Sequence, residues 1–302
     1  MEIIDTRYAG VVRLLPPALR EVAITLPPRD QLYAEELRLR AGYPPSVLLP
    51  EGERELKSTP VTVSELAAVI EIATAASMHA VRENVRAGFI NAAGGYRLGL
   101  CGSAILGDRA EVMGFSAMSS IAIRIPREFP GMADKIALAT HGDIPSTLII
   151  APPGAGKTTL LRDLVRLCSD GCEQLGVVPQ RVALCDERGE VAAVTNGTAQ
   201  MNVGRRTDIL SAAPKAQAAM MLVRTMNPQI IALDEITAEA ELHAVRYAAN
   251  CGVRLFATVH ATSLAELERK PLFARLIAAR VFELAVLLHK SNGRREYEIT
   301  QI

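Results

Sequence analysis

In the second half of the chain, from Ser146 onward, short apolar runs alternate with longer amphipathic stretches. The runs lack polar alternation, which is typical of strands that are buried on both faces of a parallel sheet. Strands that alternate with helical stretches predict a parallel sheet with helices on each side. We expect strands in segments 146–151, 181–187, 229–235, 254–261 and 282–290. A hairpin through Asn292-Gly293 is expected to follow the last of them.

The first part of the chain mixes short helical and strand-like patterns. Residues 10–26 predict a short helix that is interrupted by Pro16 and Pro17. Residues 35–50 alternate apolar and charged side chains before a glycine and two prolines, which indicates two short strands. Further along, residues 89–105 predict a hairpin with its turn at Gly94-Gly95.

A capping box predicts where the longest helix of this part begins. Thr62 is followed three residues later by Glu65, the spacing at which the two side chains cap each other's backbone N–H groups. The helix is expected to run to about Val85. Its apolar face would be formed by side chains at helical spacing, namely Leu66, Val69, Ile70, Ala73 and Ala76.

These patterns predict two domains. Residues 1–125 are expected to form a small α+β domain, whose last strand carries Ile121, Ile123 and Ile125 on one face. Residues 126–145 contain three prolines and two glycines among mixed charges, so they are expected to be a linker with room for one helical turn. Residues 146–302 are expected to form an α/β domain with a mostly parallel sheet.

Composition narrows the class of protein. A length of 302 residues and a hydrophobic content of 49% are sufficient for two domains with sizeable cores. The formal net charge of zero argues against a protein that binds nucleic-acid phosphates, because such proteins carry a basic excess. The five cysteines include Cys168 and Cys172, but no second pair stands at metal-binding spacing. Reduced thiols in a cytosolic protein are the expected state.

We also expect the protein to stay inside the cell. The first ten residues carry an acidic side chain and no long apolar region, so they do not resemble a signal peptide. The longest apolar span, residues 66–81, is interrupted by Glu71 and His79. It falls short of the ~20 apolar residues that a membrane-spanning helix needs.

A phosphate-binding loop stands between the strand expected at 146–151 and a helical pattern. Its sequence, Ala-Pro-Pro-Gly-Ala-Gly-Lys-Thr, is the P-loop pattern with alanine in place of the first glycine. Glycines let backbone N–H groups surround phosphate oxygens, and the helix N-terminus adds its positive dipole end. Lys157 would reach the β- and γ-phosphates, and the Thr158 hydroxyl would ligate Mg²⁺. The residues expected to bind the nucleotide are Ala151, Pro152, Pro153, Gly154, Ala155, Gly156, Lys157, Thr158 and Thr159.

Two acids follow the expected strand at 229–235. Ligands gather at the carboxyl ends of parallel strands, so Asp234 and Glu235 should lie beside the P-loop. Asp234 would hold the Mg²⁺ shell, and Glu235 would orient and deprotonate the attacking water. The guanine-reading motif Asn-Lys-x-Asp is absent, which favours ATP. The sequence therefore predicts a RecA-like P-loop NTPase core.

Two further features have alternative interpretations. Asp186, Glu187 and Glu190 end another apolar strand and form either a polar turn or a second acidic box beside the metal and the water. His260 ends the strand expected at 254–261. It is either a histidine of the core or a sensor that contacts the γ-phosphate or its water, and it is a candidate catalytic residue.

The order of P-loop, acidic box, Asp-Glu strand and Thr-Val-His-Ala resembles the ATPases of type II and type IV secretion systems. Segments 35–49, 89–105, 119–131 and 185–192 narrow the resemblance to the stage III sporulation AA family of endospore-forming bacteria. The resemblance covers nearly the whole chain. One position departs from the secretion ATPases, which usually have glycine before the Walker B glutamate where this chain has Asp234.

The resemblance implies a role and partners. The chain would be an ATPase that powers a channel between mother cell and forespore, working at the cytoplasmic face of membrane proteins. It would assemble as a homo-oligomer, a hexameric ring in related motors. Arginines of the N-terminal domain complete the site in secretion motors, and Arg97 and Arg124 are the candidates here, unless they are solvated surface residues. Arg205, Arg206 and Arg224 are further candidates.

Two other functions fit the same core. A scaffold that binds ATP and assembles, but hydrolyses it rarely, would need the same P-loop. A RecA-like nucleic-acid motor would also contain this core, although the neutral charge and the lack of a basic tail argue against it.

Overall fold

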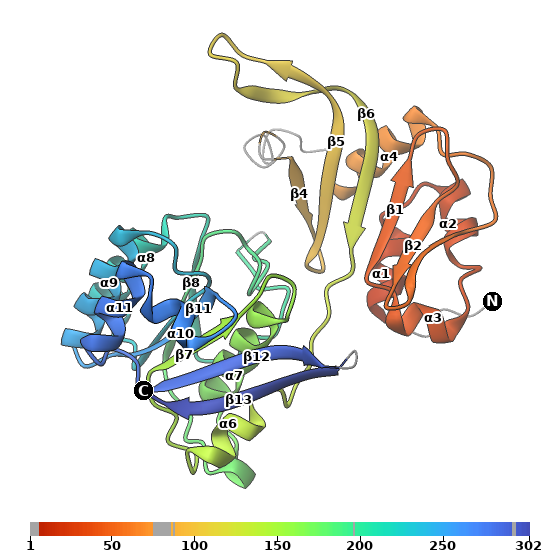
Figure 1. Cartoon of the computed structure of the whole chain (residues 1–302). Coiled ribbons are helices and arrows are strands. Elements are labelled where there is room, and N and C mark those ends of the chain that lie inside the picture. Colours follow the sequence, from red (N-terminus) through yellow and green to blue (C-terminus); the bar gives the residue numbers. More distant parts are fainter. Residues whose placement is uncertain (1–5, 75–85, 87, 196, 292–293) are drawn as a thin grey trace. The chain divides into compact units, whose positions relative to one another are not determined.

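The computed structural model of the chain describes residues 6–74, 86, 88–195, 197–291 and 294–302. Contacts divide the chain into two compact units (Figure 1). The first unit contains Met1–Arg127 together with Thr195–Gln200, and the second contains Glu128–Val194 with Met201–Ile302. None of the helices in the described ranges is long and apolar enough to cross a membrane.

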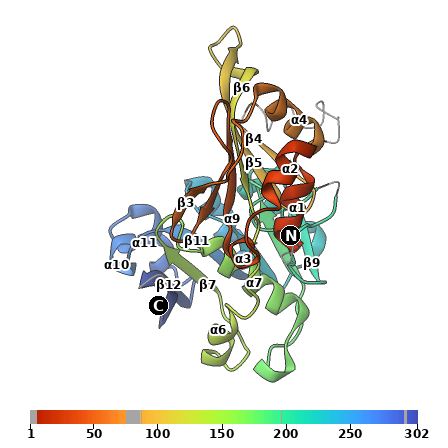
Figure 2. The same cartoon turned by 90° about the vertical axis from the view of Figure 1, so that its right-hand side faces the viewer.

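The first unit is built around an antiparallel sheet with the strand order β3-β2-β1-β6-β5-β4. Its elements are α1 (Thr6–Arg13), α2 (Pro17–Ala23), α3 (Pro28–Tyr33), β1 (Glu36–Arg40), β2 (Ser46–Leu49), β3 (Gly52–Glu55), α4 (Val63–Ala73), β4 (Phe89–Ala92), β5 (Tyr96–Leu106) and β6 (Val112–Arg124). Helices α1, α2 and α4 share one apolar core with the strands and lie together beside the sheet (Figure 2).

Local signals in this unit are confirmed where the structure describes them. Thr62 and Glu65 form the expected capping box at the start of α4. Gly94 and Gly95 both have positive φ in the turn between β4 and β5, a conformation that glycine adopts without steric cost. The expected continuation of α4 to Val85, with Ala76 on its apolar face, lies outside the described residues.

The second unit is built around a sheet with the order β13-β12-β7-β11-β10-β8-β9, parallel throughout except for the pair β12 and β13. Its elements are α6 (Asp134–Ala139), β7 (Thr147–Ala151), α7 (Lys157–Asp170), η2 (Glu173–Leu175), β8 (Val182–Asp186), β9 (Thr207–Ser211), α8 (Lys215–Met226), β10 (Ile230–Leu233), α9 (Glu239–Asn250), β11 (Arg254–His260), α10 (Leu264–Glu268), α11 (Pro271–Ala278), β12 (Leu284–Ser291) and β13 (Arg294–Gln301).

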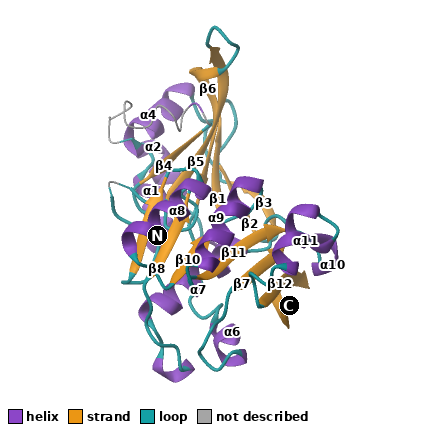
Figure 3. Cartoon of the chain, turned by 90° about the vertical axis from the view of Figure 1, so that its left-hand side faces the viewer, coloured by secondary structure: helices purple, strands orange, loops and turns teal. Residues whose placement is uncertain are grey.

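All five strands expected from apolar runs are present. β7, β8 and β10 bury every side chain, and β11 buries all but its two ends. Helices α8 to α11 share an apolar core with one set of alternating strand residues, while α7 contacts β7, β8 and β11 (Figure 3). Strand β9 was not expected, since its residues are only partly buried and form no apolar run. The turn expected at Asn292-Gly293 lies outside the described residues, although β12 and β13 pair on either side of it.

Residues 128–145 pack within the second unit, although their proline and glycine content is typical of a linker. Helix α6 buries Ile136 and Ala137. The Ala133 N–H, just before this helix, donates to the buried Asp163 carboxylate of α7 over 2.8 Å. Burial of these few apolar side chains is a tertiary effect that the composition of the segment does not reveal.

The strand order positions the site. Strand β11 lies between β7, which leads into the P-loop, and β10, which leads into Asp234. In this register His260 is opposite Ala151, the last residue of β7. The carboxyl ends of three adjacent parallel strands therefore converge at one edge of the sheet, where ligands of such sheets bind.

Candidate functional site

The P-loop connects β7 to α7 through two glycines in the left-handed region. Gly154 has a φ of +73°, and no other atom lies within 4 Å of where its Cβ would be, so its surface is open for a ligand. Gly156 has a φ of 105° and precedes the first residue of α7, Lys157. The first-turn N–H groups of a helix have no intrahelical partners, so they can donate hydrogen bonds to a bound anion.

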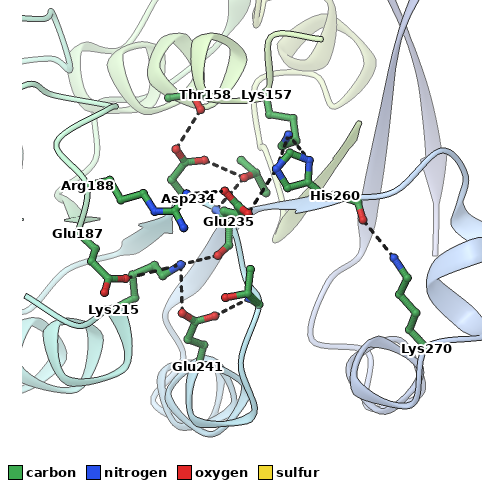
Figure 4. Close-up of polar contacts among 12 residues, drawn as sticks. Lys157, Thr158, Glu187, Arg188, Lys215, Asp234, Glu235, Glu241, His260 and Lys270 are labelled. Carbon is green, nitrogen blue, oxygen red and sulfur yellow. Dashed lines mark hydrogen bonds and ion pairs between the residues drawn. The ribbon is translucent and has the colours of Figure 1, made fainter. Parts of the chain in front are cut away.

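Three side chains contact one another in a row, one from the start of α7 and two from the carboxyl ends of β11 and β10 (Figure 4). The Lys157 Nζ lies 2.8 Å from His260 Nδ1. The His260 Nε2 lies 3.3 Å from Glu235 Oε1. Burial lowers the pKa of Lys157, and the carboxylates of Asp234 and Glu235 oppose that shift. The structure thus brings together the expected phosphate-binding lysine, the candidate sensor and the candidate base.

Asp234 is held by two threonine hydroxyls. Thr158 Oγ1 donates to one carboxylate oxygen over 2.9 Å, and Thr258 Oγ1 donates to the other over 2.8 Å. Burial raises the pKa of Asp234, and the two hydroxyl hydrogen bonds oppose this. No group of three or more His, Cys, Asp and Glu side chains in the described part of the chain could hold a metal ion alone. Mg²⁺ commonly uses only one or two protein oxygens together with waters and phosphates, so this donor set fits it.

The backbone of Glu235 is in the left-handed region, with a φ of 54°. This conformation is uncommon for a residue with a Cβ, and it clusters at functional sites. The Glu235 N–H donates to Thr258 Oγ1 over 2.8 Å, and its carbonyl accepts a hydrogen bond from the Lys215 ammonium. Arg188 contacts its second carboxylate oxygen at 3.3 Å.

Asp186, one of the expected metal ligands, is engaged by the backbone. Its carboxylate accepts hydrogen bonds from the N–H groups of Glu190, Val191 and Ala192 at 2.8 to 3.2 Å, and the side chain is buried. These bonds organise the loop after β8. They also give the buried Asp186 carboxylate hydrogen-bond donors from the protein itself, so that its burial does not require a metal ion. Its neighbour Glu187 is exposed and lies 3.8 Å from the Lys215 ammonium.

Replacing Asp186 by alanine is expected to lower the free energy of unfolding by about 3 kcal/mol, because three N–H groups, two of them buried, lose their acceptor. Urea denaturation followed by circular dichroism measures the change. The matched control Glu187→Ala, at an exposed neighbouring acid, should change it by about 0.5 kcal/mol or less. Unchanged stability of Asp186→Ala, together with weaker Mg²⁺-dependent nucleotide binding, would instead support the metal-ligand interpretation.

The two candidate arginines are neighbours in the first unit. Arg97 on β5 is directly opposite Arg124 on β6. The Arg97 guanidinium lies over the Phe89 ring at 4.1 Å. Arg124 points away from the buried face formed by the three isoleucines and is 69% exposed, with its Nε 3.6 Å from a Glu36 carboxylate oxygen. Two cationic side chains thus share one polar face of this sheet.

The remaining candidate arginines have partners away from the P-loop. Arg206 donates to the Ser169 carbonyl, and the Arg205 N–H donates to the Asp170 carboxylate. Arg224 stacks on Tyr247.

Sequence reasoning missed three residues of the site. Lys215 and Arg188 contact Glu235, and Thr258 bonds both to Asp234 and to the Glu235 N–H. Thr258 carried a weak signal, since it is the single polar residue within the apolar run of β11. Lys215 carried none, because a lysine after a proline at the start of an amphipathic helix is expected on the surface.

Comparison with known proteins identifies a family and a relative. The family model for sporulation stage III, protein AA, matches residues 6–299. Stage III sporulation protein AA of Bacillus subtilis is 32% identical over 284 residues, which cover 94% of this chain and 91% of that protein.

Two solved structures share the fold. The ATPase DotB of Legionella pneumophila has a TM-score of 0.59 and 14% identity, covering 88% of this chain and 76% of that one. The pilus retraction motor PilT, solved with bound ADP, has a TM-score of 0.61 and 15% identity, covering 94% and 81%. The sequence match spans both units and the whole site described above, so this chain belongs to the sporulation stage III protein AA family.

Proposed function

We propose that the chain is an ATP-hydrolysing motor that resembles the secretion ATPases. One observation carries the proposal. Lys157 at the start of α7, His260 at the end of β11 and Glu235 just after β10 form a continuous row of contacts. A phosphate-binding lysine and a carboxylate base are the parts that phosphoryl transfer to water requires. The histidine between them can form a hydrogen bond to the γ-phosphate or its water and lose that bond after hydrolysis.

The residues present fit a magnesium nucleotide. The open surface of Gly154 and the first turn of α7 offer backbone N–H groups to phosphate oxygens. The Thr158 hydroxyl and the Asp234 carboxylate are the oxygen donors that Mg²⁺ prefers. When bound, ATP would supply the phosphoryl group, and Mg²⁺ would neutralise part of the phosphate charge. Asp186 is satisfied by backbone N–H groups, so we assign the metal to Thr158 and Asp234.

Each side chain then has a separate task. Lys157 holds the β- and γ-phosphates, which requires it to exchange His260 for a phosphate oxygen. Glu235 orients the attacking water and takes its proton onto a carboxylate oxygen. Arg97 and Arg124 are proposed to neutralise the charge that develops on the transferred group. Their position opposite each other on one face of β5 and β6 supports this role.

We expect His260→Ala to retain ATP binding and to lower kcat by about 100-fold, because it removes the side chain that contacts Glu235 and is proposed to hydrogen-bond the γ-phosphate or its water. Nucleotide affinity by fluorescent-analogue titration and steady-state phosphate release would measure the two effects. His243→Ala, at an exposed histidine of α9, is the matched control and should leave both unchanged. Unchanged turnover of His260→Ala would remove His260 from the mechanism.

The experiment that tests the function is phosphate release from the purified protein, alone and with its membrane partners. The wild type should hydrolyse ATP with a requirement for Mg²⁺, and Lys157→Ala should lose nucleotide binding. If the wild type released phosphate no faster than Glu235→Gln in any condition, the proposal of an ATP-hydrolysing motor would be wrong. Nucleotide binding without turnover would favour the assembly scaffold, and stimulation by single-stranded nucleic acid would favour the RecA-like motor.

The biological setting is also a proposal. We propose that the protein works in the mother cell, at the cytoplasmic face of membrane proteins, as a ring that powers a channel to the forespore. Family membership supports the sporulation setting, and the likeness to a secretion-type ATPase and a pilus motor supports the assembly. Mass measurement in solution, with and without a nonhydrolysable ATP analogue, should detect a nucleotide-dependent hexamer. A monomer in both conditions would contradict self-assembly.

A further inference from the structure

The Lys215 ammonium is buried at a position where a cation is unfavourable. Lys215 is the first residue of α8, and its side chain is only 7% exposed. The N-terminus of a helix carries a positive partial charge, so a lysine there is repelled. A buried ammonium also loses its hydration and requires close acceptors. Such a local conflict is typical of residues that are placed for function.

The acceptors of Lys215 surround the base of the proposed reaction. Its Nζ donates to the carbonyl of Glu235 and lies 3.1 Å from the Glu241 carboxylate. The other oxygen of Glu241 accepts hydrogen bonds from the N–H groups of Thr237 and Ala238 at 2.6 and 3.0 Å. Figure 4 shows Lys215 between Glu187, Glu241 and the Glu235 backbone. One buried ion pair therefore holds the whole loop that leads from β10 to α9.

This loop contains the strained residue. Glu235 adopts a φ of 54°. Hydrogen bonds to its N–H group and to its carbonyl hold this conformation. On one side Thr258 accepts the Glu235 N–H, and on the other side Lys215 donates to the Glu235 carbonyl. A left-handed glutamate persists only where surrounding contacts over-determine it. Without Lys215 the carbonyl side of this residue loses its only charged partner among the described residues.

We propose that Lys215 is a positioning residue, which holds the backbone of Glu235 in the left-handed conformation so that its carboxylate faces the P-loop. The inference rests on the proposed role of Glu235 as the base. We call these contacts of Lys215 with Glu235 and Glu241 the Lys215 clamp. The Lys215 ammonium also lies 3.8 Å from the Glu187 carboxylate, which extends the clamp to the acidic segment after β8. Lys215 itself does not touch the nucleotide in this assignment.

The kinetic test compares Lys215→Met, Lys215→Arg and the control Lys135→Met. Lys135 also donates to a backbone carbonyl, that of Tyr297, but on α6. Lys215→Met should lower kcat by about 100-fold with KM unchanged, because the base is misplaced while the phosphate site is intact. Lys215→Arg keeps the charge and should recover part of the loss, and Lys135→Met should behave as wild type. In a Glu235→Gln background Lys215→Met should lower kcat no further.

Hydrogen exchange of the nucleotide-free protein tests the geometry independently of turnover. In Lys215→Met the amides of Glu235 to Ala238 should exchange about 10-fold faster, while those of β11 stay as in the wild type. If Lys215→Met does not fold, Glu241→Gln weakens the same ion pair and should show both effects in milder form. Unchanged exchange in residues 235–238 of the folded variant, or a uniform increase across the unit, would overturn the proposal. Faster loop exchange in a protein without ATPase activity would uphold the clamp and refute only the proposed function.

Discussion

Replacing Glu235 by glutamine is expected to retain nucleotide binding and to lower kcat by about 1,000-fold. Glutamine has the same shape, so the backbone contacts to Thr258 and Lys215 remain. The amide, however, cannot take a proton from water, and general-base catalysis contributes about 100- to 10,000-fold. Single-turnover phosphate release under saturating ATP isolates the chemical step from product release.

The matched control for this substitution is Glu239→Gln. Glu239 is an acid four residues along the chain, is 68% exposed and pairs with Arg275 on the surface of the same unit. It should leave kcat within about twofold of the wild type. Loss of nucleotide binding in Glu235→Gln would show that the carboxylate supports the pocket rather than the chemistry. Wild-type turnover would remove Glu235 from the mechanism.

Asp234→Asn is expected to make the nucleotide-free protein more stable and the nucleotide complex weaker. Burial raises the pKa of Asp234, so folding disfavours its ionised form. The stability that comes from this raised pKa is present in acid and is lost as the pH rises through the folded-state pKa, so the neutral amide removes a cost at pH 7. We expect a gain of about 1 kcal/mol in the free energy of unfolding.

The same change removes the negative charge that faces the metal, so Mg²⁺-dependent ATP affinity should fall by about 100-fold. Thermal unfolding without nucleotide and calorimetric titration with Mg²⁺ and a nonhydrolysable ATP analogue measure the two effects. Asp143→Asn, at an acid that is 79% exposed and paired with Arg254, should change neither. A less stable Asp234→Asn protein would mean that its hydrogen bonds to Thr158 and Thr258 outweigh the cost of burial.

The site as a whole carries unfavourable features that a purely structural sheet edge would not need. Burial lowers the pKa of Lys157 and raises that of Asp234, Glu235 has a left-handed backbone, and Lys215 places a cation at a helix N-terminus. Perturbed charges and strained backbone cluster at functional sites, where stability is given up for pre-organisation. Their concentration around one edge of the sheet favours a functional site over a P-loop that has lost its function.

Much of the second unit follows from local sequence. Apolar runs predicted the five parallel strands because a strand that is buried on both faces must be apolar along its length. The P-loop and the Asp234-Glu235 pair were recognisable because their chemistry depends on residues that are adjacent in the chain. In the first unit, the capping box at Thr62 and the glycine turn before β5 were likewise local signals.

Only the tertiary structure decided which of these residues meet. The insertion of β11 between β7 and β10 brings His260 to Lys157, and no local periodicity encodes strand order. Asp186 and Asp234 both end an apolar run in the sequence, yet backbone N–H groups from the following loop bond to Asp186 and threonine hydroxyls bond to Asp234. Lys215 looked like a surface residue until the fold buried it against Glu235 and Glu241. Short-range patterns were enough to predict five strands of the second unit and to recognise the P-loop motif. The partners of each buried charge depend on residues tens of positions away, and only the folded chain brings those together.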